Sequence, residues 1–139
     1  MSTMPLVGWN DRYSVGIYVF DVEHMQLLVL INDLYDAMVS GVSEAAILAI
    51  LTGITAFAAH HFAHEEEFFH TTGYSDGEAH RAEHRRLLEE IALFKEWCAD
   101  GDVRSIAVDL SAFLTTWFTE HTMGLDRTFC VHLRKIGIR

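Results

Sequence analysis

The sequence predicts an all-α protein, folded as an up-down-up-down four-helix bundle. Its one proline stands at position 5, so the residue that most strongly breaks helices is absent from the rest of the chain. Apolar residues recur at the 3.6-residue period of an amphipathic helix through most of the sequence. The breaks between these periodic stretches are short, and short connections make successive helices antiparallel neighbours.

An arm is expected over residues 1–20, followed by a first helix over residues 21–38. Asp21 suits the N-cap, from which its carboxylate would accept the backbone N–H of His24, three residues on. The inward-facing positions recur at helical spacing and include that histidine. They are His24, Leu27, Leu28, Ile31, Leu34, Tyr35 and Met38.

The second helix is expected over residues 43–70, after the break at Ser40-Gly41 and with Ser43 as its N-cap. Its inward face combines apolar residues with one histidine and one glutamate. The face reads Ile47, Ile50, Ile54, Phe57, His61, Glu65 and Phe68.

Residues 71–77 form the next turn, and Ser75 with Glu78 matches a capping box for a third helix that ends near residue 99. Two histidines share its apolar face, which reads His80, His84, Leu87, Ile91 and Phe94.

The fourth helix is expected over residues 103–123, after the break at residues 100–102. Gly124 then loosens the helical register ahead of Asp126, and a short segment over residues 124–139 completes the domain. The inward face reads Leu110, Phe113, Leu114, Trp117 and His121.

Length and composition favour a single soluble domain over residues 1–139, because 50% hydrophobic residues suffice for a core. Cys98 and Cys130 lack any paired-motif spacing and are expected to be reduced thiols. Twenty acidic against ten basic residues argue against nucleic acid and anionic membranes as partners. Asp, His and Glu interrupt the apolar runs and no secretory signal is visible, so we expect a cytoplasmic protein without a membrane span.

Six polar residues on these apolar faces form a candidate metal site together with Asp126, which follows the fourth helix. Helical residues four apart share a face, and the topology brings all seven to one end of the bundle, within roughly three turns. Imidazole and carboxylate ligands together suit iron, manganese or zinc, and seven ligands are too many for one ion, so two ions are expected. The set is His24, His61, Glu65, His80, His84, His121 and Asp126.

The remaining histidines and acidic residues are expected to lie elsewhere. For any one histidine, a hydrogen bond to a carbonyl explains burial as well as a metal does. The joint pattern differs, because five imidazoles and two carboxylates are costly to bury without a cation. Positions off the inward faces are His60, His64, His70 and His132, and the acidic run at Glu66 and Glu67 is expected to be solvated.

These motifs resemble those of the hemerythrins, most closely the bacterial single-domain kind, over most of the chain. The resemblance implies a non-haem di-iron centre with a bridging oxo or hydroxo group. It implies one iron bound by His80, His84 and His121, the other by His24 and His61, and both bridged by Glu65 and Asp126. The motifs are the Trp9 arm with Ser14-Val15-Gly16-Ile17, Asp21-x-x-His24, His61-Phe62-x-x-Glu65-Glu66, His80-x-x-x-His84, and Trp117-x-x-x-His121 before Asp126.

The resemblance also implies how the centre works. Two six-coordinate ions offer about twelve positions, of which the ligands and the bridging oxygen leave one open, on the iron with two histidines. The resemblance implies that O2 binds there as hydroperoxide, which makes the chain an O2 carrier, store or delivery protein rather than an enzyme. The alternatives are an O2 or redox sensor acting through a separate protein, and a di-iron peroxidase or oxidase. The lack of an output domain and of paired Glu-x-x-His motifs disfavours these alternatives.

Four residues are expected to line the O2 pocket, namely Leu28, Trp117, Phe118 and Thr122. Thr122 departs from the branched apolar residue that is common at this position in the family. Its hydroxyl would admit water or donate a hydrogen bond to bound O2, and either effect would hasten oxidation to the inactive ferric form.

We therefore expect the Thr122→Ile variant to oxidise more slowly than the wild type. The decay of the oxygenated absorption in air-saturated buffer measures this rate. A variant that decays as fast as the wild type, or faster, would refute the role given to the hydroxyl.

Overall fold

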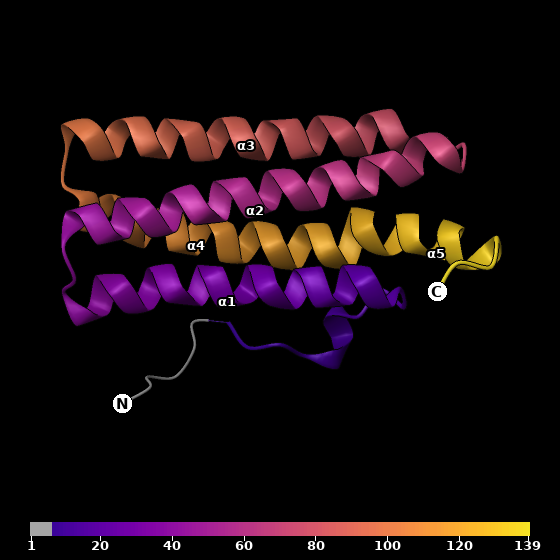
Figure 1. Ribbon diagram of the computed structural model, residues 1–139, viewed down its shortest axis with the longest axis horizontal. Helices are drawn as coiled ribbons and strands as arrows, with labels where there is room; N and C mark the ends of the chain where they lie inside the picture. The colour runs from indigo at the N-terminus through magenta and orange to yellow at the C-terminus, as the bar shows by residue number, and fades with distance from the viewer. Residues whose placement is uncertain (1–6) are drawn as a thin grey trace.

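Four long antiparallel helices form the bundle (Figure 1). The computed structural model describes residues 7–139, so residues 1–6 of the expected arm, Pro5 among them, lie outside the described part. The helices are α1 (Tyr18–Ser40), α2 (Glu44–Thr71), α3 (Gly77–Asp100) and α4 (Val103–His121). The predicted all-α four-helix bundle is confirmed, and residues 7–139 contain no strand.

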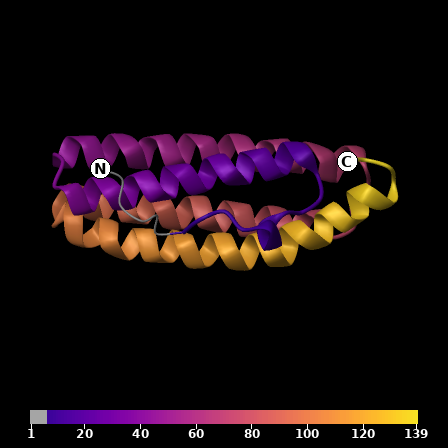
Figure 2. The same cartoon turned by 90° about the horizontal axis from the view of Figure 1, so that it is seen from below.

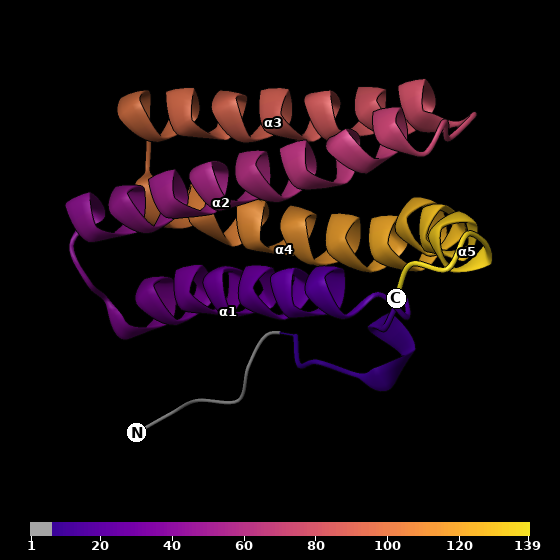
Figure 3. The ribbon, with the colours of Figure 1, turned by 45° about the vertical axis from the view of Figure 1, so that its right-hand side comes forward.

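The helices form a ring in which α1 and α3 each pack against both α2 and α4. The turns after α1 and α3 lie at one end of the bundle (Figures 1 and 3). The turn after α2 lies at the other end, where α5 (Arg127–Lys135) extends beyond α4 (Figure 2). A short 3-10 helix, η1 (Asp11–Tyr13), packs against η2 (Thr122–Asp126), the segment that joins α4 to α5.

The start of α1 shows that the predicted cap is wrong. The helix begins at Tyr18, and its N-cap residue Ile17 makes no side-chain capping bond. Asp21 lies inside the first turn and accepts hydrogen bonds from Ser14 Oγ at 2.6 Å and from the Val15 N–H at 2.8 Å. Its carboxylate therefore ties the arm to α1. The sequence could not reveal this, because an apolar N-cap residue gives no local signal.

Of the N-caps predicted for α2 and α3, one is confirmed and the other is wrong. Ser43 caps α2 as predicted, because its hydroxyl accepts the Ala46 N–H at 3.2 Å. The predicted capping box of α3 is wrong, since the N-cap residue is Asp76 and its side chain makes no capping bond. Backbone bonds of the preceding turn take its place, among them the Gly77 N–H to Tyr74 C=O bond at 3.1 Å.

By length and composition, α2 could cross a membrane, contrary to the expectation from the sequence. No Asp, Glu, Lys or Arg occurs between Glu44 and Glu65, and the mean hydropathy of one 18-residue window is 1.6. One third of that window, 33%, is buried within the structure. The core helix of a bundle has the same composition, and α2 packs against both α1 and α3.

The end of α4 is where the fold departs most from a simple bundle. The helix ends at His121, and η2 is a π-helical segment that leads directly into α5. The looser register expected at Gly124 is present as this wider turn. The short C-terminal segment expected from the sequence is therefore mostly helical.

The core consists of two apolar clusters. The larger cluster runs along the four long helices and includes Phe62 and Phe118, while the smaller gathers Phe20, Phe69 and Phe129 near α5. Phe69 is the buried aromatic residue of α2 in this region. Phe68, which was predicted to face inward, is only half-buried.

The tight packing of Gly77 on Phe69 generates a prediction for stability. A Cβ added at Gly77 would lie 3.0 Å from Phe69 Cβ and 3.3 Å from its Cγ, so Phe69 would have to move. We expect Gly77→Ala to lower the free energy of unfolding by about 1–3 kcal/mol, the usual cost of overpacking.

The matched control is Gly53→Ala. Gly53 lies within α2 with nothing inside 4 Å of an added Cβ. This variant should raise the free energy of unfolding by up to about 1 kcal/mol through helix propensity. Thermal and urea unfolding followed by circular dichroism measure both, and changes of the same sign in the two variants would contradict the packing argument.

Candidate metal centre

All seven predicted site residues are buried, and they meet at the end of the bundle that carries the α2–α3 turn. None is more than 6% exposed. The long helices and η2 each contribute part of the set. α1 contributes His24, α2 contributes His61 and Glu65, α3 contributes His80 and His84, and the last turn of α4 with η2 contributes His121 and Asp126.

The nitrogen and oxygen atoms of these residues form two groups that share the same two carboxylates, Glu65 and Asp126. Within each group all the potential ligand atoms lie within 4.8 Å of one another. The three-histidine group adds His80, His84 and His121 to the shared carboxylates, and the two-histidine group adds His24 and His61.

Asp126 lies between the two groups. Its Oδ1 is 2.9 Å from Nε2 of His80 and 3.0 Å from Nε2 of His121, while Oδ2 is 3.2 Å from Nε2 of His24. Its two oxygens therefore face different groups, as a bridging carboxylate requires.

Glu65 also connects the two groups, from α2, but its contacts come from a single oxygen. Its Oε1 is 3.3 Å from Nε2 of His61 and 3.3 Å from Nε2 of His84. Glu65 and His61 are four residues apart on α2, so they share one face of the helix. Each shared carboxylate thus contacts histidines of both groups.

The π-helical segment explains how Asp126 reaches the site. In a regular α-helix, residues three or four apart share a face, and residues five apart do not. The i→i+5 hydrogen bonding of a π turn instead brings residues five apart into line. His121 and Asp126 stand five apart across η2, so both point into the bundle.

The site contains buried nitrogen and oxygen atoms that lack hydrogen-bond partners, as expected where a metal ion binds. Within residues 7–139 several buried side-chain atoms have no hydrogen-bond partner: both ring nitrogens of His24, both oxygens of Glu65, Nδ1 of His80 and Nε2 of His84. Each such group costs about 1–3 kcal/mol when it is buried unpaired. A cation at each group would bind one nitrogen of each histidine, Nε2 of His24 and of His84 among them, together with the oxygens of Glu65. The mixed nitrogen and oxygen set suits iron, manganese or zinc.

Charge also favours bound cations. Burial, with the charge of Asp126 beside it, raises the pKa of Glu65 well above its usual value. Burial opposes ionisation of Asp126 too, but His121 and hydrogen bonds from neighbouring imidazoles hold the pKa of this carboxyl well below its usual value. Burial, with His80 and His121 nearby, lowers the pKa of His84 to about 2. The imidazole is thus neutral, which is the form that binds metal.

Two further carboxylates support the histidines, and sequence reasoning missed both. Glu23 is buried, and its Oε1 lies 2.6 Å from Nδ1 of His61 while its Oε2 lies 2.7 Å from Nδ1 of His64. Burial opposes its ionisation, but the hydrogen bonds from the two imidazoles lower the pKa of Glu23. An ionised Glu23 accepts a hydrogen bond from the Nδ1–H of His61. The unprotonated Nε2 of His61 then faces the two-histidine group.

Glu66, on α2, supports His84 of α3 in the same way. Its assignment to a solvated surface is therefore wrong. Its Oε2 lies 3.0 Å from Nδ1 of His84, and its Oε1 lies 3.3 Å from Nε of Arg81. We call Glu23 and Glu66 the outer carboxylates. In the sequence, Glu23 directly precedes His24, and Glu66 directly follows Glu65. That adjacency was the available signal, but it is indistinguishable from an ordinary run of acidic residues.

The other histidines lie away from the two groups. His60 and His70 are exposed, as expected, and His132 is half-buried with Nε2 at 3.1 Å from Thr72 Oγ1. His64 is the exception, because it contacts the site indirectly through Glu23.

The residues expected around an O2 pocket divide between the two groups. Leu28 and Phe118 are buried, and the Phe118 ring lies 5.9 Å from the His24 ring, beside the two-histidine group. Thr122 is buried at the start of η2. Trp117 lies elsewhere, because its indole stacks on the His121 ring at 4.3 Å, beside the three-histidine group.

Known proteins resemble the chain over most of its length. A family model described as the hemerythrin HHE cation binding domain matches residues 15–130. Bacteriohemerythrin from Stenotrophomonas maltophilia is 28% identical over 126 residues, which cover 91% of this chain and 80% of that protein. Bacteriohemerythrin from Clostridium acetobutylicum is 26% identical, covering 87% of this chain and 96% of that protein. A crystal structure of wild-type hemerythrin shares the fold with a TM-score of 0.82 at 23% identity, over 92% of this chain and 98% of that one.

The hydrogen bond from His61 to Glu23 predicts a loss of metal affinity in Glu23→Gln. The neutral amide accepts the imidazole proton more weakly, so we expect affinity to fall about 10–100-fold, the usual cost of removing a group that orients a ligand. Competition with a chromophoric chelator measures this affinity. The control is Glu67→Gln, because Glu67 is exposed on the same helix as His61. Equal affinities in the two variants would rule out the supporting role of Glu23.

Proposed function

The chain belongs to the hemerythrin family, and we propose that it holds two iron ions and binds O2 reversibly. The observation that carries the proposal is the pair of unequal groups, one with three histidines and one with two, that share two carboxylates. A lone histidine cluster would suit many metals and functions. An asymmetric pair of neighbouring sites is suited to two ions, of which one keeps a position for a ligand from outside.

We assign the ligands from these groups. His80, His84 and His121 would bind one iron and His24 and His61 the other, with Glu65 and Asp126 bridging both. An oxo or hydroxo group would complete the bridge. The contacts of Asp126 Oδ1 and Oδ2 with different groups support its part in this assignment.

We place O2 at the iron of the two-histidine group, which has the unfilled position. Ferrous ions, when bound there, would supply the electrons that make O2 binding possible. The chain supplies an enclosed apolar surrounding, because Phe118 packs against His24 and Leu28 stands one turn after His24 on α1. Leu28 and Phe118 have 3% and 0% of their surfaces exposed. Thr122 adds a buried hydroxyl at this end of α4, where it is 1% exposed.

The outer carboxylates hold the histidines in the orientation that O2 binding needs. Glu23 fixes His61 on the proposed O2 side, and Glu66 fixes His84 on the other side. On its far side Glu66 forms an ion pair with Arg81, whereas Glu23 accepts a second hydrogen bond from His64. Both histidines are therefore locked by a hydrogen bond that would persist whether or not O2 is bound.

Charge supports reversible binding over turnover of a substrate. Two ferrous ions, two carboxylates and one hydroxide would sum to a single positive charge inside an apolar pocket. Carboxylate-rich di-iron sites, with a Glu-x-x-His motif on each of two helices, suit oxidative chemistry better. We therefore propose an O2 carrier, store or delivery protein in the cytoplasm, with a separate protein as recipient of the O2 or of a signal.

An oxygen-dependent optical change tests the function. Iron-loaded protein, reduced without air and then exposed to O2, should develop a charge-transfer band in the visible range that disappears again under vacuum. Elemental analysis of the same sample should give two iron ions per chain. Protein that binds iron but shows no reversible band would disprove the carrier function.

A pair of histidine variants links the optical change to the site. His61→Ala should abolish the reversible band, because His61 is one of only two histidines in its group. His60→Ala, which removes the exposed neighbouring histidine, should leave the band unchanged.

A further inference from the structure

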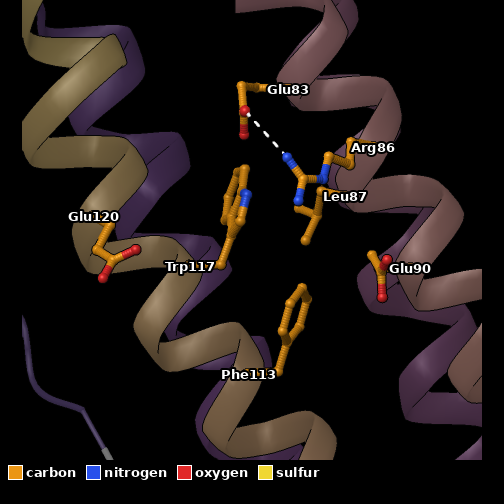
Figure 4. A pocket seen from close by; sticks show the side chains of 7 residues that line it. All are labelled: Glu83, Arg86, Leu87, Glu90, Phe113, Trp117 and Glu120. Carbon is orange, nitrogen blue, oxygen red and sulfur yellow. Dashed lines mark ion pairs between the residues drawn. The ribbon is translucent and has the colours of Figure 1, made fainter.

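A surface pocket lies between α3 and α4, close to the three-histidine group (Figure 4). We call it the acidic pocket. Its volume is about 370 Å³, which is within the usual size of a small-molecule site. Its walls come from both helices and are formed by Glu83, Arg86, Leu87, Glu90, Phe113, Trp117 and Glu120.

The walls of the acidic pocket suit a flat cation. Trp117 and Phe113 project from α4 toward the α3 side of the pocket (Figure 4), and an aromatic face attracts a positive charge. Three carboxylates surround these rings. Only Glu83 has a cationic partner, with Arg86 Nη1 at 3.8 Å, whereas Glu90 and Glu120 have none within residues 7–139. The pocket therefore carries excess negative charge next to two aromatic rings.

The same tryptophan connects the pocket to the proposed metal ligands. The Trp117 ring stacks on the His121 ring with centroids 4.3 Å apart and planes 14° apart. A second hollow of about 310 Å³ lies beside the first and shares Glu83, Trp117 and Glu120 with it. His121 itself lines this second hollow. A molecule in the acidic pocket would thus be separated from a metal-binding imidazole by one indole ring.

We propose that the acidic pocket is the docking site of a small, flat, positively charged one-electron donor, and that its electrons reach the metal pair through the stacked rings of Trp117 and His121. The inference rests on the proposed function, because an O2-binding di-iron protein stops working once its iron becomes ferric. A route for re-reduction keeps it in use. Neither Phe118 nor any residue of the two-histidine group lines the pocket, so a docked donor would leave the O2 side free.

The electron balance is simple. Each docked donor loses one electron and gains one unit of charge, while one ferric ion becomes ferrous. Two encounters return a diferric centre to the diferrous state, and solvent supplies any proton taken up by the bridging oxygen. Trp117 and His121 are neither oxidised nor reduced, since they serve only as the contact through which the electron passes.

Charge complementarity selects the sign of the donor. The chain has a net charge of −10, and the acidic pocket adds local negative potential on an already acidic molecule. Such a field attracts cations and repels anions, and salt weakens both effects.

Reduction kinetics with two donors of opposite charge test the proposal. Iron-loaded ferric protein is mixed with the methyl viologen radical cation or with dithionite, and the loss of ferric absorption is followed by stopped flow. In the triple variant Glu83→Gln, Glu90→Gln and Glu120→Gln, reduction by methyl viologen should slow about tenfold at low salt. Reduction by dithionite should not slow.

Three further variants check the charge and the route. Arg86→Gln should speed reduction by methyl viologen, because it removes the competing cation at the pocket. Trp117→Leu should slow it, and Trp117→Phe should restore part of the rate. A control variant neutralises three exposed carboxylates away from the pocket, Asp33→Asn, Glu44→Gln and Glu67→Gln, and should match the wild type.

Binding to the metal-free protein separates this inference from the proposed function. Oxidised methyl viologen, titrated by calorimetry, should bind the wild type about tenfold more tightly than the acidic-pocket triple variant. If the protein takes up iron and binds O2, yet the triple variant and the control variant behave alike with methyl viologen, the docking site is overturned and the O2 function stands. If no iron binds but the calorimetric difference remains, the pocket stands as a cation site and the electron route is overturned.

Discussion

Glu65 and Asp126 lie side by side in the interior of the bundle, near the end that carries the α2–α3 turn, and the rest of the structure depends on what balances their charge. Both are essentially unexposed, with five imidazoles around them and no lysine or arginine in either group. Two like charges in such surroundings cannot both be ionised cheaply, and the opposite directions of their pKa shifts follow from this. Two bound cations would remove the conflict, because they would neutralise the carboxylates and bind one nitrogen of each imidazole at once.

Around this centre the chain is arranged in layers of decreasing burial. The histidines contact the shared carboxylates, the outer carboxylates contact the histidines, and His64 and Arg81 contact the outer carboxylates from partly exposed positions. The two sides of the centre therefore differ in the residue that contacts the outer carboxylate. Glu66 is joined to a guanidinium, which keeps its charge at all ordinary pH values, whereas Glu23 is shared between two imidazoles. The asymmetry of three histidines against two is thus continued outward to the surface.

Much of the fold and most of the candidate site could be predicted from the sequence, because both repeat at helical spacing. The four helices, the cap at Ser43 and the burial of all seven site residues follow from that periodicity. The caps of α1 and α3 could not be predicted, since an apolar N-cap and a turn closed by its own backbone leave no local signature. Glu23 escaped notice because its role depends on His61, which lies 38 residues away and on another helix.

The π-helical segment makes chain length, rather than residue type, a requirement of this site. A regular α-helix turns about 100° per residue, so five residues of it would leave Asp126 about 140° around the axis from His121. Without the wider turn, the same residues would therefore point Asp126 away from the metal groups and turn Phe129 and Leu133 out of the small apolar cluster. Substitutions in η2 can be absorbed one side chain at a time. An inserted residue cannot, because it would rotate everything after it by about 100° while α4 stays in place.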